Sequence, residues 1–381
     1  MFKRIAAISF ILGCTSAAWF ILGATLYSRT YDSSEKLKPG VGTTWGTAQT
    51  QRPPTATMHG SSLAPESSRI DVSLNLNHRQ KGLLWYSTYV VDFAGTYVFR
   101  NTGGDAQPVL FALNFPADRA IYDGLTMEVD QRPIPFAATA HGASTTVLLQ
   151  PGQAASFRVA YRSQGLDRWT YKPGDDVTQS RDFQLTMRTN FDAIDFPLNS
   201  LSPTAKRQVA GGWELSWRYA NLISGFEIAM VMPERLQPGP LAGEISFFAP
   251  ASLLLFFFLI FTITRLRGID LHPMNYFFLA TAFFAFHLLL AYLVDHISIH
   301  AAFAICSAVS IFLSVSYLRL VTGLRFALVE AGIAQFVYLV LFSYAFFLRG
   351  YTGLAVTIGC IVTLFVVMQM TGRVGWQERL R

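Results

Sequence analysis

Six long apolar segments constrain this chain more than any other feature. The segment Tyr276–Val294, for example, is interrupted only by Thr281 and His287. A helix of about 17 to 25 apolar residues can cross the hydrocarbon core of a bilayer. The sequence therefore predicts six transmembrane helices, at Ile5–Tyr27, Ile245–Ile263, Tyr276–Val294, Ala301–Leu318, Phe326–Leu348 and Gly353–Met370.

The composition agrees with a membrane protein and argues against a nucleic-acid partner. Hydrophobic residues make up 51% of the chain and charged residues 14%, with a mean hydropathy of +0.33, which is too apolar for an ordinary soluble enzyme. The net charge is +6, yet residues 28–244 carry equal numbers of basic and acidic side chains. Nucleic-acid binding needs a clustered basic surface. The expected partners are the lipid bilayer and other envelope proteins or components.

The distribution of basic residues predicts the orientation. One set of helix ends carries Lys3, Arg4, Arg265, Arg267, Arg319, Arg325, Arg373, Arg379 and Arg381, whereas the opposite short loops hold only Arg349. Cytoplasmic loops are the ones enriched in Lys and Arg. We therefore expect a multi-pass protein of a bacterial inner membrane, with both termini in the cytoplasm and residues 28–244 in the periplasm.

The predicted domains follow from these spans. Residues 1–27 form a signal-anchor helix; a cleaved lipoprotein signal at "ILGC" is the alternative, but the apolar run continues past Cys14. Residues 28–68 are rich in Ser, Thr, Pro and Gly and predict a flexible linker. A periplasmic domain over 69–244, a five-helix bundle over 245–376 and a cytoplasmic tail over 377–381 complete the chain.

The middle region has the pattern of an all-β domain. In "RIDVSLNLN", Ile70, Val72, Leu74 and Leu76 alternate with polar residues, as a half-buried strand requires. "NTGGD" at 101–105 predicts the turn of a hairpin before "PVLFALNF". Further short strands at regular spacing indicate an antiparallel, sandwich-like domain inserted between helices 1 and 2.

The C-terminal half resembles the CreD-like inner-membrane protein family. The resemblance rests on "LHPMNYFFLATAFFAFHLLLAYLVDHI" at 271–297 and on "MQMTGRVGW" at 368–376, and "TWGTAQ" at 44–49 is similar to a Trp-Gly segment of that family. The family has one N-terminal span, a large exported domain and a terminal helical bundle. The resemblance implies a role in envelope integrity or stress tolerance. It implies no reaction.

Two ionisable residues in the spans are candidate functional residues, because charge is costly in hydrocarbon. Glu330 lies one to two turns inside the fifth span. It either stays near the headgroups and pairs with Arg325 or Arg319, or takes part in proton-coupled or substrate contacts. His287, in the middle of the third span, either bonds to a neighbouring helix or acts in a proton relay.

The fourth span carries a stripe of small and polar side chains, Ser307, Ser310, Ser314 and Tyr317. Such residues form packing seams with hydrogen bonds between helices, and a polar groove is the alternative. Four further residues, His272, Pro273, Asp295 and His296, are assigned to the membrane boundaries at the two ends of the third span.

No catalytic motif is present. The sequence has no GxxxxGK[ST], HExxH or GxSxG, and its three cysteines all lie in apolar runs. We therefore expect no enzyme activity, no cofactor and no metal site. Two functional hypotheses remain: a non-enzymatic envelope protein whose β-domain binds a partner or envelope component, and a transporter or lipid-handling protein that uses a polar groove in the bundle.

Overall fold

The computed structural model describes residues 2–81, 84–118, 120–174, 177–348 and 350–372. The chain forms two compact units. One comprises residues 1–34 and 236–381, and the other comprises residues 35–235. The expected tail at 377–381 lies outside the described residues.

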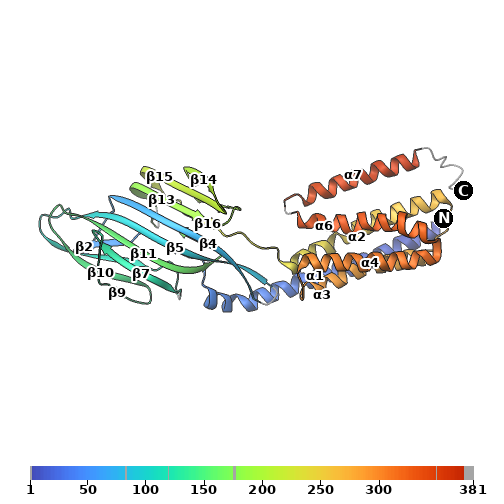
Figure 1. The fold of residues 1–381 in the computed structure, drawn as a ribbon, viewed down its shortest axis with the longest axis horizontal. Coiled ribbons are helices and arrows are strands. Elements are labelled where there is room, and N and C mark those ends of the chain that lie inside the picture. Colours follow the sequence, from blue (N-terminus) through green and yellow to red (C-terminus); the bar gives the residue numbers. More distant parts are fainter. Residues whose placement is uncertain (1, 82–83, 119, 175–176, 349, 373–381) are drawn as a thin grey trace. The chain divides into compact units, whose positions relative to one another are not determined.

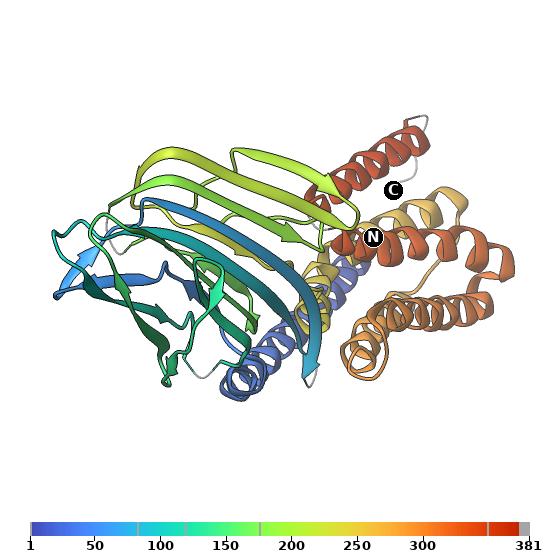
Figure 2. The same cartoon turned by 60° about the vertical axis from the view of Figure 1, so that its left-hand side comes forward.

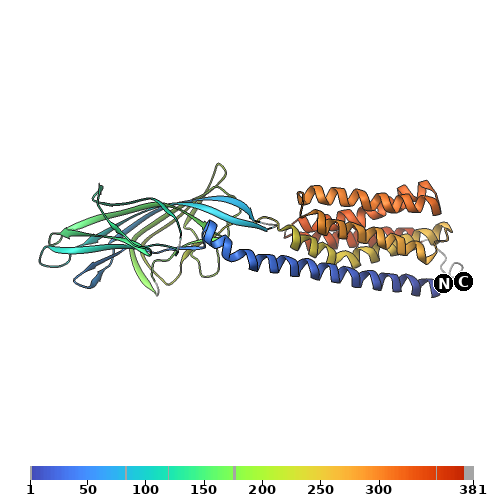
Figure 3. The ribbon, with the colours of Figure 1, turned by 90° about the horizontal axis from the view of Figure 1, so that it is seen from below.

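The first unit is helical, as predicted (Figure 1). Within the described residues, six helices are long and apolar enough to cross a membrane. Their elements are α1 (Phe2–Trp45), α2 (Pro238–Arg267), α3 (Pro273–Leu293), α4 (Ile299–Thr322), a composite fifth helix and α7 (Thr352–Thr371). Figure 3 shows α1 as one continuous helix.

The helix ends follow ordinary capping rules. α2 begins with Pro238 and is followed by its C-cap Gly268, whose φ of +68° suits a residue without a Cβ. α4 begins after Ser298, whose hydroxyl accepts a hydrogen bond from the Ala301 amide. These caps allow short turns between neighbouring spans.

The fifth helix is irregular. It consists of the π-helix η1 (Phe326–Ala331), α5 (Gly332–Gln335), the π-helix η2 (Phe336–Leu341), α6 (Phe342–Tyr344) and the 3₁₀ turn η3 (Ala345–Phe347). π-Helical turns are rare and change which side chains share a face. Here they flank Gln335, which is fully buried.

The second unit is the β-domain, with three sheets (Figures 1 and 2). The eight-stranded sheet has the order β14 (Ala205–Val209), β15 (Gly212–Ser224), β13 (Thr178–Thr189), β4 (Ser67–Lys81), β5 (Leu84–Arg100), β11 (Ala154–Leu166), β7 (Tyr122–Val129) and β8 (Arg132–Pro133). The five-stranded sheet contains β3 (Ser61–Leu63), β2 (Thr55–Met58), β6 (Gln107–Asn114), β10 (Gly142–Leu149) and β9 (Ala137–Ala138), and the three-stranded sheet contains β1 (Gln49–Gln51), β12 (Arg168–Tyr171) and β16 (Ile228–Val231).

The core of the β-domain lies on one face of the large sheet. Ile70, Val72 and Leu74 are buried there, as their alternation predicted. The same core contains residues from the other two sheets, including Trp169 and Phe111. This layered arrangement confirms the sandwich-like fold and leaves the polar residues of β4 on the opposite face.

The structure contradicts the prediction of an irregular linker over 28–68. α1 continues to Trp45, and β1, β2 and β3 occupy much of the remainder. In β1, Gln49 and Gln51 are fully buried. Gln49 Nε2 donates to Ser163 Oγ at 2.8 Å, and Gln51 Oε1 accepts from Tyr161 at 2.5 Å. Because the buried side chains of β1 are polar, the strand lacks the alternating apolar pattern that predicts a strand. Their hydrogen bonds offset the cost of removing them from water.

The predicted hairpin at 101–105 is also wrong. β5 belongs to the eight-stranded sheet and β6 to the five-stranded sheet, so the chain changes sheets at this point. Asn101 holds the crossing by donating to the carbonyls of Asp105 and Leu149. In addition, the domain is not wholly antiparallel, because β4 pairs with β13 in parallel and β1 with β12. Turn residues identify a reversal but not the sheet that the next strand joins.

Candidate functional site

A row of alternating charges crosses the outer face of the eight-stranded sheet. The strand registers place its members directly opposite one another on seven strands, in the order Arg207, Glu214, Arg188, Ser73, Asp92, Arg162 and Asp123. Because side chains alternate between faces, all of them project away from the core. We call these residues the charge row.

Neighbouring members of the charge row form ion pairs. Arg162 Nε lies 2.6 Å from Asp92 Oδ1, and Glu214 accepts from Arg207 at 2.7 Å and from Arg188 at 3.0 Å. The hydrogen bond from Arg207, followed by that from Arg188, lowers the pKa of Glu214. The bond to Asp92 raises the pKa of Arg162, and Asp123 adds to this effect. Both pKa shifts favour the charged forms of Glu214 and Arg162.

A β-bulge brings Asp123 into the charge row. The register between β7 and β11 shifts between Ala160 and Arg162, so that Asp123 lies opposite Arg162. Gly124, the next residue, has a φ of +61°, a conformation that side chains disfavour. Without the extra residue, Gly124 would stand opposite Arg162. The bulge therefore places a carboxylate beside the guanidinium.

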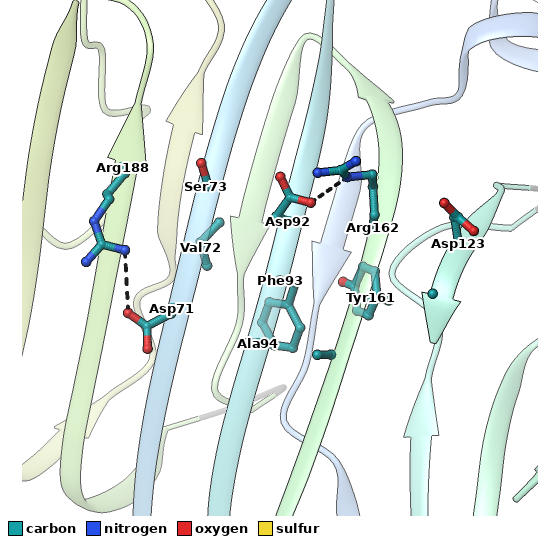
Figure 4. Close-up of a pocket in the computed structure, with 12 residues that line it drawn as sticks. Asp71, Val72, Ser73, Asp92, Phe93, Ala94, Asp123, Tyr161, Arg162 and Arg188 are labelled. Atoms are coloured by element: carbon teal, nitrogen blue, oxygen red, sulfur yellow. Dashed lines mark hydrogen bonds and ion pairs between the residues drawn. The ribbon is translucent and has the colours of Figure 1, made fainter. Parts of the chain in front are cut away.

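The central part of the charge row lines a groove of about 530 Å³. Figure 4 shows Asp92 and Arg162 joined on one side of this groove, and Arg188 joined to Asp71 on the other. Arg188 NH1 lies 3.9 Å from Asp71 Oδ1. We call this the sheet groove. It offers carboxylates and guanidinium groups within one open hollow.

The sheet groove suits recognition of a ligand that carries both charges. Guanidinium groups bind carboxylate or phosphate in a bidentate manner, and carboxylates accept from amines and hydroxyls. In the described parts of the chain, no group of three or more His, Cys, Asp or Glu side chains could hold a metal ion. The guanidinium and carboxylate groups of the groove are suited to binding a charged ligand.

In the helical unit, the predicted stripe of α4 lies at helix contacts. Ser310 is fully buried and donates to the Ala282 carbonyl of α3 at 2.6 Å. Ser307 instead bonds to the Phe303 carbonyl of its own helix at 2.7 Å. The Ser314 hydroxyl is buried without a hydrogen-bond partner among the described protein atoms.

Other polar contacts extend this seam to neighbouring helices. Tyr317 donates to Asn275 of α3 at 2.7 Å, and Gln335 donates to Ser310 at 2.8 Å. Ser252 of α2 donates to the Tyr338 carbonyl, and the Tyr338 hydroxyl donates to Thr363 of α7 at 2.9 Å. These contacts join α2, α3, α4, α7 and the fifth helix through hydrogen bonds.

His287 lies between α3 and α1. Its Nδ1 is 3.0 Å from the Phe283 carbonyl of its own helix, so the expected bond to a neighbouring helix is absent from the described structure. Its ring instead meets that of Trp19 at 5.4 Å between centroids. His287 Nε2 and Trp19 Nε1 are both buried without partners among the described protein atoms.

Glu330 forms an ion pair with Arg267, at the end of α2. From the sequence we expected Arg325 or Arg319 as the partner, because both lie near Glu330 in the chain. Arg267 is distant in the chain, so sequence proximity could not identify it. Only 11% of the Glu330 side chain is exposed, and Oε2 has no partner among the described residues.

The boundary residues have structural contacts at the ends of α3. His272 is its N-cap and accepts from the Met274 amide at 3.2 Å, and Pro273 is the first helical residue. Asp295 pairs with Arg29 of α1 at 3.0 Å, whereas His296 is exposed in the following turn. The roles proposed for these positions remain predictions.

Sequence reasoning did not single out the residues of the sheet groove. Asp71 and Ser73 were visible as the polar positions of an alternating strand, but their partners come from strands far away in the sequence. Gln335 and Trp19 were also missed. A lone amide in an apolar run is a signal that could have identified Gln335.

The comparison with protein families concerns the helical unit. Residues 247–377 match the model of a family described as inner membrane protein CreD. This segment is similar to the CreD family. The CreD match confirms the resemblance expected from the sequence and covers less than half of the chain. No curated protein matches the sequence.

Solved structures show only weak likeness. A Legionella pneumophila protein whose description names nutrient binding has a TM-score of 0.36 and 9% identity, over 63% of this chain and 84% of that one. An M1 zinc metallopeptidase of Deinococcus radiodurans has a TM-score of 0.28 and 10% identity, over 46% of this chain and 43% of the peptidase. At these scores neither carries an argument about this chain.

Proposed function

We propose that this protein supports cell-envelope integrity and stress tolerance without catalysing a reaction. Its β-domain extends into the periplasm and binds an envelope component or partner protein in the sheet groove. The helical unit anchors it in the inner membrane. The observation that carries the proposal is the groove itself, with charges of both signs aligned across the sheet.

The orientation rests on two observations. An even number of spans leaves both termini on the same side, and α1 and α2 flank the β-domain. Lys3 and Arg4 lie at the N-terminal end of α1, and Arg265 and Arg267 lie at the C-terminal end of α2. Neither of these ends continues into the β-domain, as expected for cytoplasmic ends. Reporter fusions at the end of β16 should be active only as periplasmic reporters. Activity of the cytoplasmic reporter there would contradict the orientation.

Photo-crosslinking in cells tests the binding role. A photoreactive residue at Ala94, which lines the sheet groove, should capture a reproducible envelope component. The double substitution Arg162→Glu and Arg188→Glu should abolish this capture. The matched control is Arg158→Glu with Arg207→Glu, on the same face but outside the groove. Equal capture by both double variants would contradict the proposal.

The second candidate is a transporter or lipid-handling protein. One observation favours it: His287 Nε2, Ser314 Oγ and Gln335 Oε1 are buried and have no hydrogen-bond partner among the residues that the structure describes, and such atoms are costly in a membrane. Under this function, Glu330→Gln with His287→Phe should abolish complementation at unchanged membrane abundance. Full complementation by that variant would eliminate it.

A further inference from the structure

The sheet groove has the length of a short extended peptide. Its lining comes from five neighbouring strands, in the order β13, β4, β5, β11 and β7. Neighbouring strands lie about 4.8 Å apart, so the groove crosses about 19 Å of sheet from the first of these strands to the last. An extended peptide covers this length with about six residues, at about 3.4 Å each. The groove can therefore hold one linear segment that crosses the strands.

The hollow exists because the residues beside the charge row are mostly small. In the next row on the same face of the sheet, the strand registers align Thr186, Asp71, Ala94 and Ala160. Ala94 and Ala160 line the groove, as does Gly124 in the bulge. Their short side chains leave room for a ligand that lies along the charge row.

The two arginines of the groove keep donors available for a ligand. Arg162 donates to Asp92 through Nε, and its two Nη groups form no hydrogen bond with the described residues. Arg188 donates to Glu214 through Nε, and its Nη1 lies 3.9 Å from Asp71, beyond hydrogen-bond distance. A guanidinium group has five N–H donors, so both arginines can bind a further carboxylate.

Two carboxylates of the groove are open to a cation. Asp123 influences Arg162 electrostatically but forms no hydrogen bond or ion pair with the described residues (Figure 4). The Asp71 side chain is 63% exposed, and its ion pair with Arg188 spans 3.9 Å. Exposed carboxylates accept hydrogen bonds from ammonium groups. The groove can therefore bind basic as well as acidic side chains.

The spacing of these charges matches the side-chain repeat of an extended peptide. Asp71 and Asp92 lie one and two strands from Arg188, at about 5 and 10 Å. Arg162 and Asp123 lie three and four strands from it, at about 14 and 19 Å. Alternate side chains of an extended peptide point to the same face, about 7 Å apart. When the first is at Arg188, the second falls between Asp71 and Asp92, the third at Arg162 and the fourth at Asp123.

We propose that the sheet groove binds an extended protein segment in which acidic and basic side chains alternate, with one uncharged residue between them. This inference rests on the proposed function and names the class of partner. The acidic side chains bind the two arginines, and the basic ones bind the aspartates. A neutral glycan would give these ions no new partners. The two aromatic residues that line the groove, Phe93 and Tyr161, are buried in the core and cannot stack on a sugar.

Two peptides of equal composition test the proposal. The purified full-length protein in neutral detergent is titrated with labelled Glu-Ser-Lys-Ser-Glu-Ser-Lys and, separately, with Glu-Ser-Glu-Ser-Lys-Ser-Lys, both with blocked ends. Fluorescence anisotropy measures the affinities. The first, alternating peptide should bind about tenfold more tightly, because the second sets two of its four charges against like charges in either direction. Equal affinities, or tighter binding of the second peptide, would overturn the proposal.

Exchanging one ion pair alters the order of charges in the groove at constant net charge. In the variant Asp92→Arg with Arg162→Asp, affinity for the alternating peptide should fall about tenfold, because its second acidic side chain then meets a carboxylate. The matched control is Arg158→Glu with Glu128→Arg, an ion pair on the same face that does not line the groove. This control should bind as the native protein does. Equal affinities of the two variants would contradict the proposal.

A filling variant keeps the test decisive if the exchanged pair disturbs folding. Ser73→Tyr places a ring in the middle of the groove, leaves every charge in position and suits a strand. It should abolish binding of the alternating peptide. Asn75→Tyr, at the next outward position of β4 and outside the groove, should bind it normally. Equal binding by both variants would overturn the proposal.

The proposed function and this inference fail in distinguishable ways. In the cellular crosslinking at Ala94, mass spectrometry of the fragment around this position identifies what was captured. A crosslinked peptide supports the inference. A crosslinked glycan or lipid would overturn it, although the groove would still bind an envelope component. Absence of any adduct, together with tight binding of the alternating peptide to the purified protein, would contradict the proposed function alone.

Discussion

The outer face of the eight-stranded sheet and the interior of the helical unit use polar residues in opposite ways. In the helical unit, Ser310, Gln335 and Tyr317 are bonded to other helices. On the sheet, Arg162 pairs with Asp92 and Arg188 pairs with Glu214, but Asp92, Arg162 and Arg188 still line an open groove. Hydroxyl and amide side chains thus join helices in one region, whereas charged side chains remain accessible in the other. This difference is why we assign recognition to the β-domain.

The largest expected effect concerns the framework of the β-domain. Gly46→Ala should destabilise that unit by about 3 kcal/mol, because the backbone is left-handed and the new Cβ meets the Gln164 carbonyl. Gly60 has a φ of +77° with open space around it, so Gly60→Ala should cost only about 1 kcal/mol. Denaturant unfolding of the full-length protein in detergent measures both. Equal effects would show that the carbonyl contact is unimportant.

The next effect concerns the seam between helices. Ser310→Ala should destabilise the helical unit by about 1 kcal/mol, because Gln335 then loses its hydrogen-bond acceptor. Ser307→Ala should have almost no effect, since that hydroxyl bonds to its own helix. Unfolding by a denaturing detergent, followed by circular dichroism, compares the two variants. A larger loss for Ser307→Ala would contradict the assignment of the seam.

A smaller effect is expected where α1 docks on α3. Arg29 pairs with Asp295, and their side chains are 35% and 18% exposed. A double-mutant cycle with Ala at both positions should give a coupling energy of about 0.5 kcal/mol, given this exposure. The more exposed pair Arg4–Asp270 should give less. Coupling energies in the reverse order would show that exposure does not govern these contacts.

The smallest effect is a pH dependence on the sheet. Arg207 and Arg188 lower the pKa of Glu214 below its ordinary value of 4.5. Its stabilising contribution is therefore complete above pH 4.5 and is lost as the pH falls through the lower folded-state pKa. The native protein should lose more stability between pH 6 and pH 3 than Glu214→Gln does. Because the group is exposed, high salt should reduce this difference. Identical pH profiles would contradict it.

The sequence predicted the spans well because membrane burial depends on local composition. Six apolar runs correspond to six long helices, and His272-Pro273 marks the start of α3 as expected. Local patterns also identified β4. In contrast, β1 was missed because its buried residues are glutamines, and the β5–β6 hairpin was wrong because pairing depends on distant strands.

The candidate sites were likewise predictable only where they depend on residues close together in the sequence. The polar stripe of α4 was recognisable at helical spacing, but only the structure distinguishes Ser310, which bonds to α3, from Ser307, which bonds to its own helix. The charge row forms only because seven strands pair in a particular register and a bulge at Gly124 shifts Asp123 into line. No local pattern in the sequence encodes that alignment.

Complementation of an envelope-stress phenotype tests the central claim most directly. Cells lacking the native protein would express either Arg162→Glu with Arg188→Glu or Ser310→Ala with His287→Phe, at equal membrane abundance. We predict that the groove variant fails to restore stress tolerance and that the helical variant restores it. Restoration by the groove variant together with failure of the helical variant would contradict the account.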